Sequence, residues 1–193
     1  MERPQGPFPS LPAGMDLTIK RHFDSYREKN QLPPELKELD VKLYDGPEFK
    51  KWRNNRTGIQ WTDAEGNILR GAIDDILVTP ENKLVILDYK TRGFKVKEDT
   101  VGYYEFQLNT YKFLLESTGQ NVENYGYLLF YYPDKVLPKG GITFHKDLRE
   151  VQLTTEGIQK VFTDALHVLA LSKLPKASET CGYCSWSSRT ALP

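Results

Sequence analysis

The chain has 193 residues and a mass of 22.2 kDa, which fits one domain with a substantial core. A hydrophobic content of 39% and only two cysteines exclude wholesale disorder, a collagen-like fibre and a disulfide scaffold. The 26 basic residues balance 26 acidic ones, which argues against nucleic-acid binding by bulk charge alone but leaves room for a local basic surface. The longest apolar run, residues 125–132, is too short to span a bilayer. No targeting signal is visible, so a cytoplasmic location is expected.

The first third of the chain is expected to hold a leader, two helices and an ambiguous segment. Residues 1–14 are rich in proline and read as a flexible leader. Asp16 is expected to cap a helix over residues 16–29. Pro34 is expected to open a short helix over residues 34–39, and residues 41–57 fit no single element.

Strands dominate the middle of the chain. Residues 58–61 are expected to form a strand, and residues 68–78 and 84–91 form the clearest strands because both are rich in β-branched side chains. Turn residues at 79–83 separate these two strands, which predicts a hairpin. A helix over residues 101–117 should follow, ended by a glycine.

The last third is expected to add two strands, a helix and a tail. Residues 125–132 form an aromatic-rich strand, and a further strand runs from the Gly140–Gly141 pair to about residue 153. Thr155 should cap a helix to about residue 171. The order of elements predicts an α/β fold with a mixed sheet flanked by helices, formed as one domain over residues 15–172 with a tail at 173–193.

The predicted hairpin carries a concentrated set of charges. If a five-residue loop joins Val78 to Leu84, Asp74 faces Asp88 across the two strands, about 5 Å apart at their Cβ atoms. Lys90 is two residues beyond Asp88 and shares its face. A register slip by one residue would exchange the faces, so Asp75 competes with Asp74.

The rest of this hairpin is apolar on both faces, which is typical of strands in the middle of a covered sheet. Carboxylates in such a place are costly unless they are paired or bind metal. Two oxygen ligands from neighbouring strands suit a hard cation such as Mg²⁺ or Mn²⁺. The alternative is an ordinary ion pair between aspartate and lysine at an exposed strand end.

A Gln–Tyr pair lies on the predicted helix that follows. Gln107 and Tyr111 are four residues apart and therefore share one helix face. By itself this spacing also fits an ordinary amphipathic helix with a solvated glutamine.

Three short motifs in order together resemble the PD-(D/E)xK nuclease superfamily, and within it the RecB-like branch. They are Gly71-Ala72-Ile73-Asp74, Asp88-Tyr89-Lys90-Thr91 and Gln107-Leu108-Asn109-Thr110-Tyr111. The resemblance covers about residues 71–132, and isoleucine stands where the superfamily's name has proline. It implies a restriction-endonuclease-like core.

The resemblance also implies roles for individual residues. The implied catalytic set is Asp74, Asp88, Lys90, Gln107 and Tyr111. Asp74 and Asp88 would hold Mg²⁺ or Mn²⁺, with the backbone carbonyl of Tyr89 as a further ligand. Lys90 would orient the attacking water or stabilise the transition state. His22 is the one histidine on the predicted first helix, where many relatives place another ligand, but an ordinary surface histidine is the alternative.

The implied function is a divalent-metal-dependent nuclease that hydrolyses phosphodiester bonds of DNA, with an exonuclease-like site. Arg92, Lys95 and Lys97 make the region after the second strand locally basic and are expected to bind the nucleic acid. Other proteins of a repair or defence complex are further expected partners, and no membrane is expected. The alternative is a catalytically idle module on the same fold that binds nucleic acid or a protein.

The tail carries a Cys-x-x-Cys pair, Cys181 and Cys184. The CRISPR-associated iron–sulphur nucleases, to which the resemblance extends, bind a cluster through four cysteines. Only two are present here, so a complete cluster is not expected. A remnant, a disulfide or half of a zinc site remain open. In a third hypothesis this cysteine pair is the functional element, as a zinc or redox site, and the acidic hairpin has only a structural role.

Overall fold

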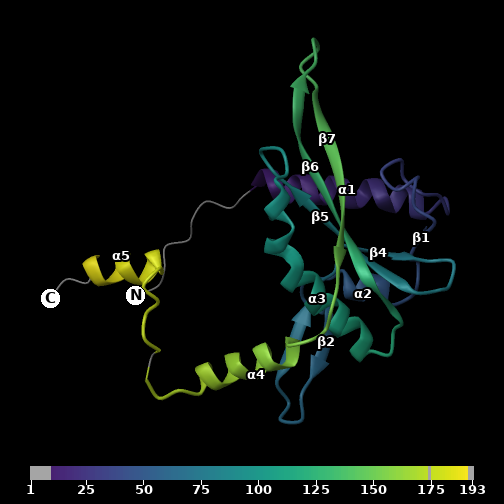
Figure 1. Ribbon diagram of the computed structural model, residues 1–193. Helices are drawn as coiled ribbons and strands as arrows, with labels where there is room; N and C mark the ends of the chain where they lie inside the picture. The colour runs from purple at the N-terminus through teal and green to yellow at the C-terminus, as the bar shows by residue number, and fades with distance from the viewer. Residues whose placement is uncertain (1–9, 174, 191–193) are drawn as a thin grey trace. The chain divides into compact units, whose positions relative to one another are not determined.

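The computed structural model describes residues 10–173 and 175–190. The chain divides into two compact units, Met1–Thr155 and Glu156–Pro193. The first unit contains a five-stranded mixed sheet with helices on both faces, as Figure 1 shows. This arrangement confirms the predicted α/β fold class. The predicted domain limits stay a prediction.

The sheet places the predicted hairpin at its centre. In spatial order its strands are β1 (Lys42–Leu43), β4 (Asp75–Val78), β5 (Leu84–Thr91), β6 (Val122–Val136) and β7 (Ile142–Gln152). β5 and β6 are parallel, and the other neighbours are antiparallel. A parallel pair needs a crossover connection. The 3₁₀ turn η1 (Glu98–Thr100) and the helix α3 (Gly102–Ser117) supply it.

β4 and β5 pair in the predicted register, with Asp75 facing Leu87 and Ile76 facing Ile86. The single strand predicted over residues 68–78 is wrong, however. It is divided into β3 (Ile68–Gly71) and β4, with a break at residues 72–74. β3 pairs with β2 (Ile59–Thr62) in a separate two-stranded sheet. The chain therefore changes partner strands between β3 and β4, and a continuous strand cannot follow both sheets.

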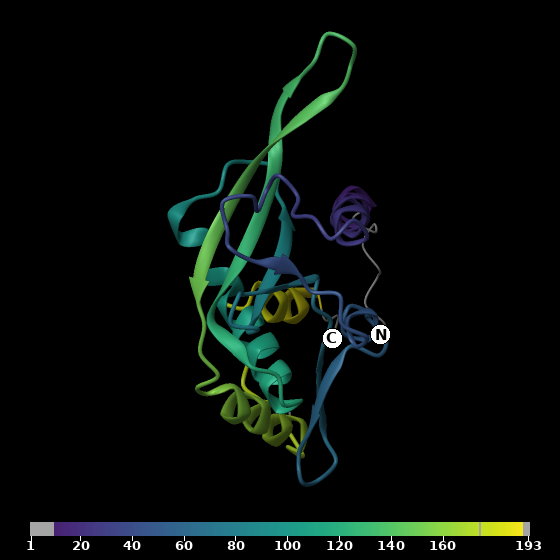
Figure 2. The same cartoon turned by 90° about the vertical axis from the view of Figure 1, so that its right-hand side faces the viewer.

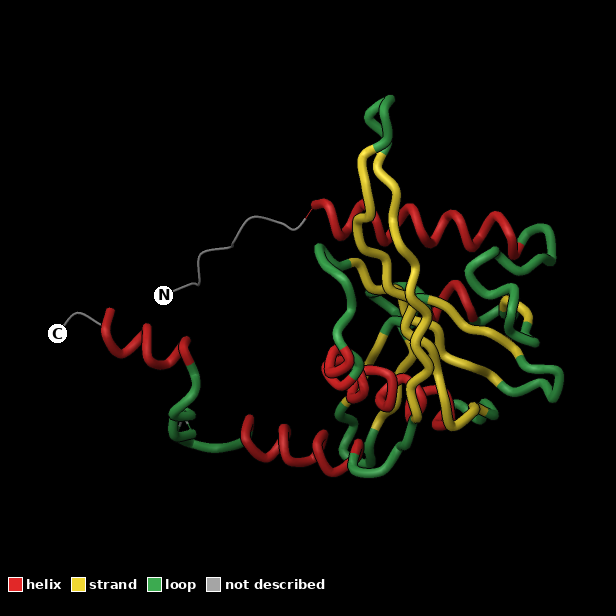
Figure 3. The backbone as a smooth tube through the Cα atoms, turned by 45° about the horizontal axis from the view of Figure 1, so that its top comes forward, coloured by secondary structure: helices red, strands yellow, loops and turns green. Residues whose placement is uncertain are grey.

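Each face of the main sheet has its own apolar core. Helix α1 (Ser10–Arg27) packs on one face through Ile19 and Phe23, and α3 covers the other face (Figure 3). The strand residues on the α1 face are Leu77, Val85, Leu87, Tyr89, Tyr127, Leu129 and Tyr131. On the α3 face, the ring of Tyr104 lies 5.9 Å from that of Phe130. The apolar character of both faces follows from this double cover.

Two predicted helix limits in the first unit are wrong. α1 begins at Ser10 and not at Asp16. Pro12 is tolerated in its first turn, because a backbone N–H there has no helical partner to lose. Residues 1–9 of the predicted leader lie outside the described residues. Residues 34–39 form successive turns in place of the predicted helix: Leu36 and Leu39 each donate a backbone hydrogen bond to the third residue before them.

The remaining elements also refine the predictions. The ambiguous segment contains β1 and the short helix α2 (Phe49–Trp52), and β6 is longer than predicted. In the second unit, α4 (Ile158–Leu169) begins after Gly157, whose φ of 78° is left-handed, so Thr155 is not its cap. The predicted tail contains α5 (Gly182–Thr190). Among the described residues, no helix is long and apolar enough to cross a membrane.

Candidate active site

Two carboxylates lie close together, Asp74 in the break after β3 and Asp88 in β5. Oδ2 of Asp74 accepts a hydrogen bond of 3.2 Å from the backbone N–H of Tyr89. Asp88, the residue before Tyr89, lies in β5 with only 1% of its surface exposed. Asp74 lies outside the strand ladder, but its hydrogen bond with Tyr89 holds it next to Asp88, the residue that it faces in the predicted register. The structure therefore brings Asp74 and Asp88 together.

The electrostatic environment of Asp88 disfavours its ionised form. Burial, and then the negative charge of Asp74, raise the pKa of Asp88 to about 7, although the ammonium of Lys90 opposes the shift. Lys90 forms an ion pair with Oδ2 of Asp88, as its predicted shared face requires. Within the described chain, that oxygen accepts no hydrogen bond of normal geometry. Asp88 is thus a buried acid that is paired with one cation, Lys90, and repelled by the charge of Asp74.

Gln107 of α3 joins the other polar groups. Its Oε1 accepts a hydrogen bond of 3.1 Å from Nζ of Lys90. Its Nε2 donates to the hydroxyl oxygen of Tyr111 at 2.7 Å and to Oδ1 of Asp88 at 3.4 Å. The amide therefore fixes the lysine, one carboxylate and the tyrosine relative to one another. All five residues of the predicted catalytic set belong to one contiguous cluster.

Tyr111 contributes a neutral hydroxyl. Burial raises the pKa of Tyr111 to about 12; the hydrogen bond from Gln107 opposes the shift, and the charges of Asp88 and Asp74 add to it. The ring lies directly against Gly71, where an added Cβ would come within 2.8 Å of Cε1 of Tyr111. The glycine of the first motif is thus needed for the close approach of α3 to β3.

Lys20 is a member of the cluster that the sequence did not predict. Its Nζ lies 2.8 Å from Oδ1 of Asp74 and 2.9 Å from Oδ2 of Asp16. Burial alone would lower the pKa of Lys20, but the charges and hydrogen bonds of Asp74 and then Asp16 outweigh it and leave the pKa raised. The only signal in the sequence is the four-residue spacing of Asp16 and Lys20, which usually marks a surface ion pair.

His22 lies elsewhere. Its Nε2 is 3.2 Å from Oε2 of Glu35, and its ring packs edge-on against Phe23 and Tyr26. Within the described part of the chain, no contact links His22 to Asp74 or Asp88. From α1 it is Lys20 that reaches the carboxylates.

Asp75, the competing acid, belongs to a separate cluster on the α1 face. It is fully buried, with an ion pair from Arg27 to Oδ1 and a hydrogen bond of 2.5 Å from the hydroxyl of Tyr89 to Oδ2. Nη2 of Arg53 lies 3.9 Å from the same Oδ2. Burial raises the pKa of Asp75 in spite of these cations. This acid is enclosed by protein and anchors α1 to the sheet.

The predicted nucleic-acid-binding residues follow β5 directly. Lys95 and Lys97 are exposed and Arg92 is half-buried. Among the described residues, none of the three has an ion-pair partner closer than 4 Å. Their charges are therefore available to an anion beyond the end of β5, the strand that carries Asp88 and Lys90.

Cys181 and Cys184 lie at the start of α5 in the second unit. They form no disulfide, and the backbone N–H of Cys184 donates to Sγ of Cys181 at 3.4 Å. Their role as a structural metal or redox pair stays a prediction.

Comparison with known proteins shows the family of this chain. A sequence model of the PD-(D/E)XK nuclease superfamily matches residues 6–189. The chain belongs to the PD-(D/E)XK nuclease superfamily. A search of curated proteins finds no match. The crystal structure of SSO0001 resembles this chain with 17% sequence identity and a TM-score of 0.41. The match covers 92% of this chain and 66% of SSO0001, just under two thirds of that protein's length.

PD-(D/E)XK nucleases generally use divalent metal ions such as Mg²⁺ or Mn²⁺. Within the described residues, no group of three or more His, Cys, Asp or Glu side chains could hold an ion. Magnesium is often bound by only one or two carboxylates, together with water and substrate phosphate. Asp74 and Asp88 fit that pattern, because their negative charges repel each other and the buried Oδ2 of Asp88, in the described residues, is balanced only by its ion pair with Lys90.

Proposed function

We propose that this PD-(D/E)XK protein is a divalent-metal-dependent nuclease of the RecB-like branch, which hydrolyses phosphodiester bonds of DNA in an exonuclease-like manner. The observation that carries the proposal is the contact set of one amide: Gln107 bonds Lys90, Asp88 and Tyr111, and Asp74 lies alongside. An acid pair and an amine held in one fixed arrangement match what phosphodiester hydrolysis requires.

In this proposal Asp74 and Asp88 would hold the ion, and the backbone carbonyl of Tyr89 would add an oxygen. A bound divalent ion would lower the pKa of a water molecule and polarise the phosphate. Lys90 supplies a fixed positive charge where negative charge develops. Gln107 keeps that ammonium oriented through a 3.1 Å hydrogen bond. The neutral hydroxyl of Tyr111 can donate to a phosphate oxygen. His22 is not included among the ligands, because it pairs with Glu35.

Binding of the substrate is assigned to the segment after β5. Lys95 and Lys97 are exposed cations, and Phe94 in the same loop is 84% exposed. Tyr103, at the start of α3, is 77% exposed. Phosphates attract the cations, and exposed aromatic rings stack on unpaired bases. Proteins of a repair or defence complex stay predicted partners.

The test is cleavage of labelled linear and circular DNA, single- and double-stranded, with Mg²⁺ or Mn²⁺. We expect the wild type to degrade linear DNA only when metal is present. Asp88→Asn and Lys90→Met should each lose about 100-fold or more of the rate, since each removes charge at the reacting centre.

Matched controls are Asp40→Asn and Lys42→Met, which change the same charges at exposed positions on the far side of the sheet. They should keep the wild-type rate. Cleavage of circular DNA would contradict exonuclease-like action. DNA binding without cleavage under either metal would overturn the nuclease proposal and favour an idle binding module.

A further inference from the structure

A two-stranded arm extends from the catalytic end of the sheet. β6 pairs with β5 only as far as Tyr131, which faces Thr91. Beyond it, within the described part of the chain, β6 and β7 pair only with each other, from Tyr132 facing His145 to Val136 facing Ile142. We call residues 132–145 the hairpin arm. Figures 1 and 2 show it rising beyond the rest of the sheet.

The arm begins at the level of the candidate active site. Lys90 of β5 faces Phe130 of β6 in the parallel ladder, and Phe130 is two residues before the first residue of the arm. Val136 is six residues after Phe130 on β6. At a rise of about 3.3 Å per residue, the tip reaches about 20 Å past the lysine. Because Arg92 also bonds β6 at Tyr131, the basic loop leaves the sheet at the same end.

The surface of the arm is apolar and basic. Val136 and Ile142 are 69% and 59% exposed, and an isolated two-stranded ribbon is at best marginally stable in water. Lys135 and Lys139 are exposed and have no ion-pair partner within the described residues. The one acid of the arm, Asp134, is engaged by His145 at 3.1 Å. The arm therefore presents unpaired positive charge beside exposed apolar side chains.

We propose that the hairpin arm is a substrate-binding element that grips the nucleic acid away from the bond being cut. This inference rests on the proposed function, because the partner is chosen by the position of the arm beside the site. Lys135 and Lys139 contact phosphates, and the apolar tip packs against sugars or enters between bases, as apolar wedges do. A reach of about 20 Å corresponds to about six base pairs of duplex.

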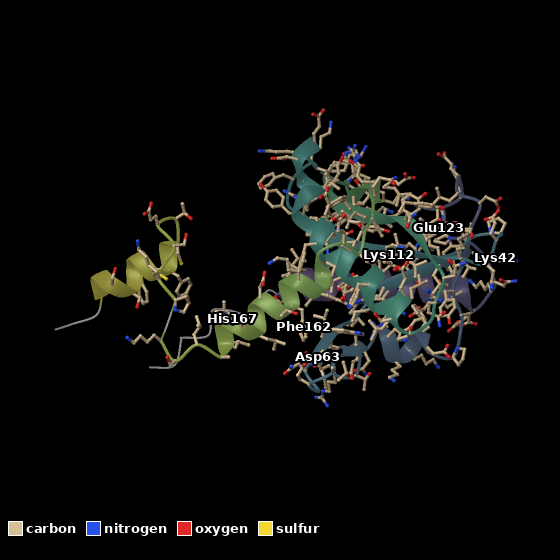
Figure 4. The ribbon with its side chains drawn as sticks, turned by 60° about the horizontal axis from the view of Figure 1, so that its bottom comes forward. Lys42, Asp63, Lys112, Glu123, Phe162 and His167 are labelled. Atoms are coloured by element: carbon tan, nitrogen blue, oxygen red, sulfur yellow. The ribbon has the colours of Figure 1, made fainter. Side chains whose placement is uncertain are left out.

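The test compares Lys135→Gln/Lys139→Gln with a matched double variant, Lys29→Gln/Lys42→Gln. The control removes the same charge from two exposed positions at the opposite edge of the sheet, where Glu28, Asn30 and Lys42 line one pocket beside β1 (Figure 4 labels Lys42). Binding of a fluorescent duplex of about 20 base pairs is measured with Ca²⁺ in place of Mg²⁺, from about 50 to 200 mM salt.

Each phosphate contact contributes about 0.9 to the slope of log affinity against log salt, so the arm variant should lose about 2 from that slope. The control should keep the wild-type slope. Thermal melting should show that all variants fold, since every changed residue is exposed. An arm variant with the wild-type slope would overturn the inference and leave the arm as a surface for a protein partner.

The binding measurement separates this inference from the proposed function. If the wild type cleaves DNA but the arm variant keeps its slope, the arm proposal fails and the nuclease stands. If the slope falls as expected but no metal supports cleavage, the nuclease proposal fails and the arm stands.

Discussion

Ionisation of Asp88 should destabilise the metal-free protein as the pH rises. The pKa of Asp88 is about 7 in the folded chain, because burial and the charge of Asp74 disfavour the carboxylate. In the unfolded chain it is about 4. The folded state therefore binds the proton more tightly, and the free energy of unfolding falls as pH rises from the unfolded to the folded pKa.

The size of this loss follows from the span of the shift. Each pH unit well between the two pKa values costs about 1.4 kcal/mol and the slope halves at the folded pKa, so the interval from pH 5 to 7 lowers the stability by about 2 kcal/mol. Asp88→Asn mimics the protonated acid and should not lose this stability. At about pH 3 the two proteins should be nearly equally stable, and the asparagine variant should be the more stable by about 1 kcal/mol at pH 5 and by several kcal/mol above pH 7.

The assay is urea denaturation with EDTA at several pH values between about 5 and 8. The difference between Asp88→Asn and wild type cancels the other titrating groups, and Asp40→Asn, at an exposed position, should give a flat difference. With saturating Mg²⁺ the gap should shrink, since an ion stabilises the ionised Asp88 of the wild type. A difference that is independent of pH, or one that favours the wild type as pH rises, would refute the reasoning.

Three further perturbations test the surroundings of the cluster. Lys20→Met removes a cation 2.8 Å from Asp74 and should tighten Mn²⁺ binding several-fold in calorimetry, whereas unchanged affinity would mean that the lysine does not compete with the ion. Tyr89→Phe removes a buried hydrogen bond to Asp75 and should cost about 1–3 kcal/mol in urea denaturation; a neutral result would mean that water replaces the hydroxyl. Gly119→Ala forces a side chain into a φ of +84° at the end of α3 and should cost about 1 kcal/mol in the same assay, unless the turn can relax.

The pairing of β4 with β5 could be predicted because it is encoded locally. Turn residues fix the loop length, loop length fixes the register, and the register brings Asp74 towards Asp88. The break at residues 72–74 could not be predicted in this way. It arises because β3 pairs with β2, and the choice of a partner strand in another sheet leaves no trace in the alternation of side chains.

The contribution of α1 to the site shows the same limit. The resemblance pointed to His22, but Lys20 contacts Asp74. Two residues apart on a helix are separated by about 200°, so these side chains point to nearly opposite sides. The rotation of α1 about its axis is set by Ile19 and Phe23 packing on the sheet. A helical periodicity gives the apolar face, but only the packed structure shows which polar neighbour reaches the carboxylates.

Tyr89 holds the adjacent acids Asp74 and Asp75 on opposite faces of the sheet. Its backbone N–H holds Asp74 on the α3 face at 3.2 Å, and its hydroxyl holds Asp75 on the α1 face at 2.5 Å. Arg27 fixes Asp75 from the helix, so the backbone at the break has an anchored residue immediately after Asp74. Asp74 itself is held against the repulsion of Asp88 by the Tyr89 N–H and by Lys20. The buried cluster on the α1 face therefore adds a third anchor that keeps the two carboxylates of the candidate site together.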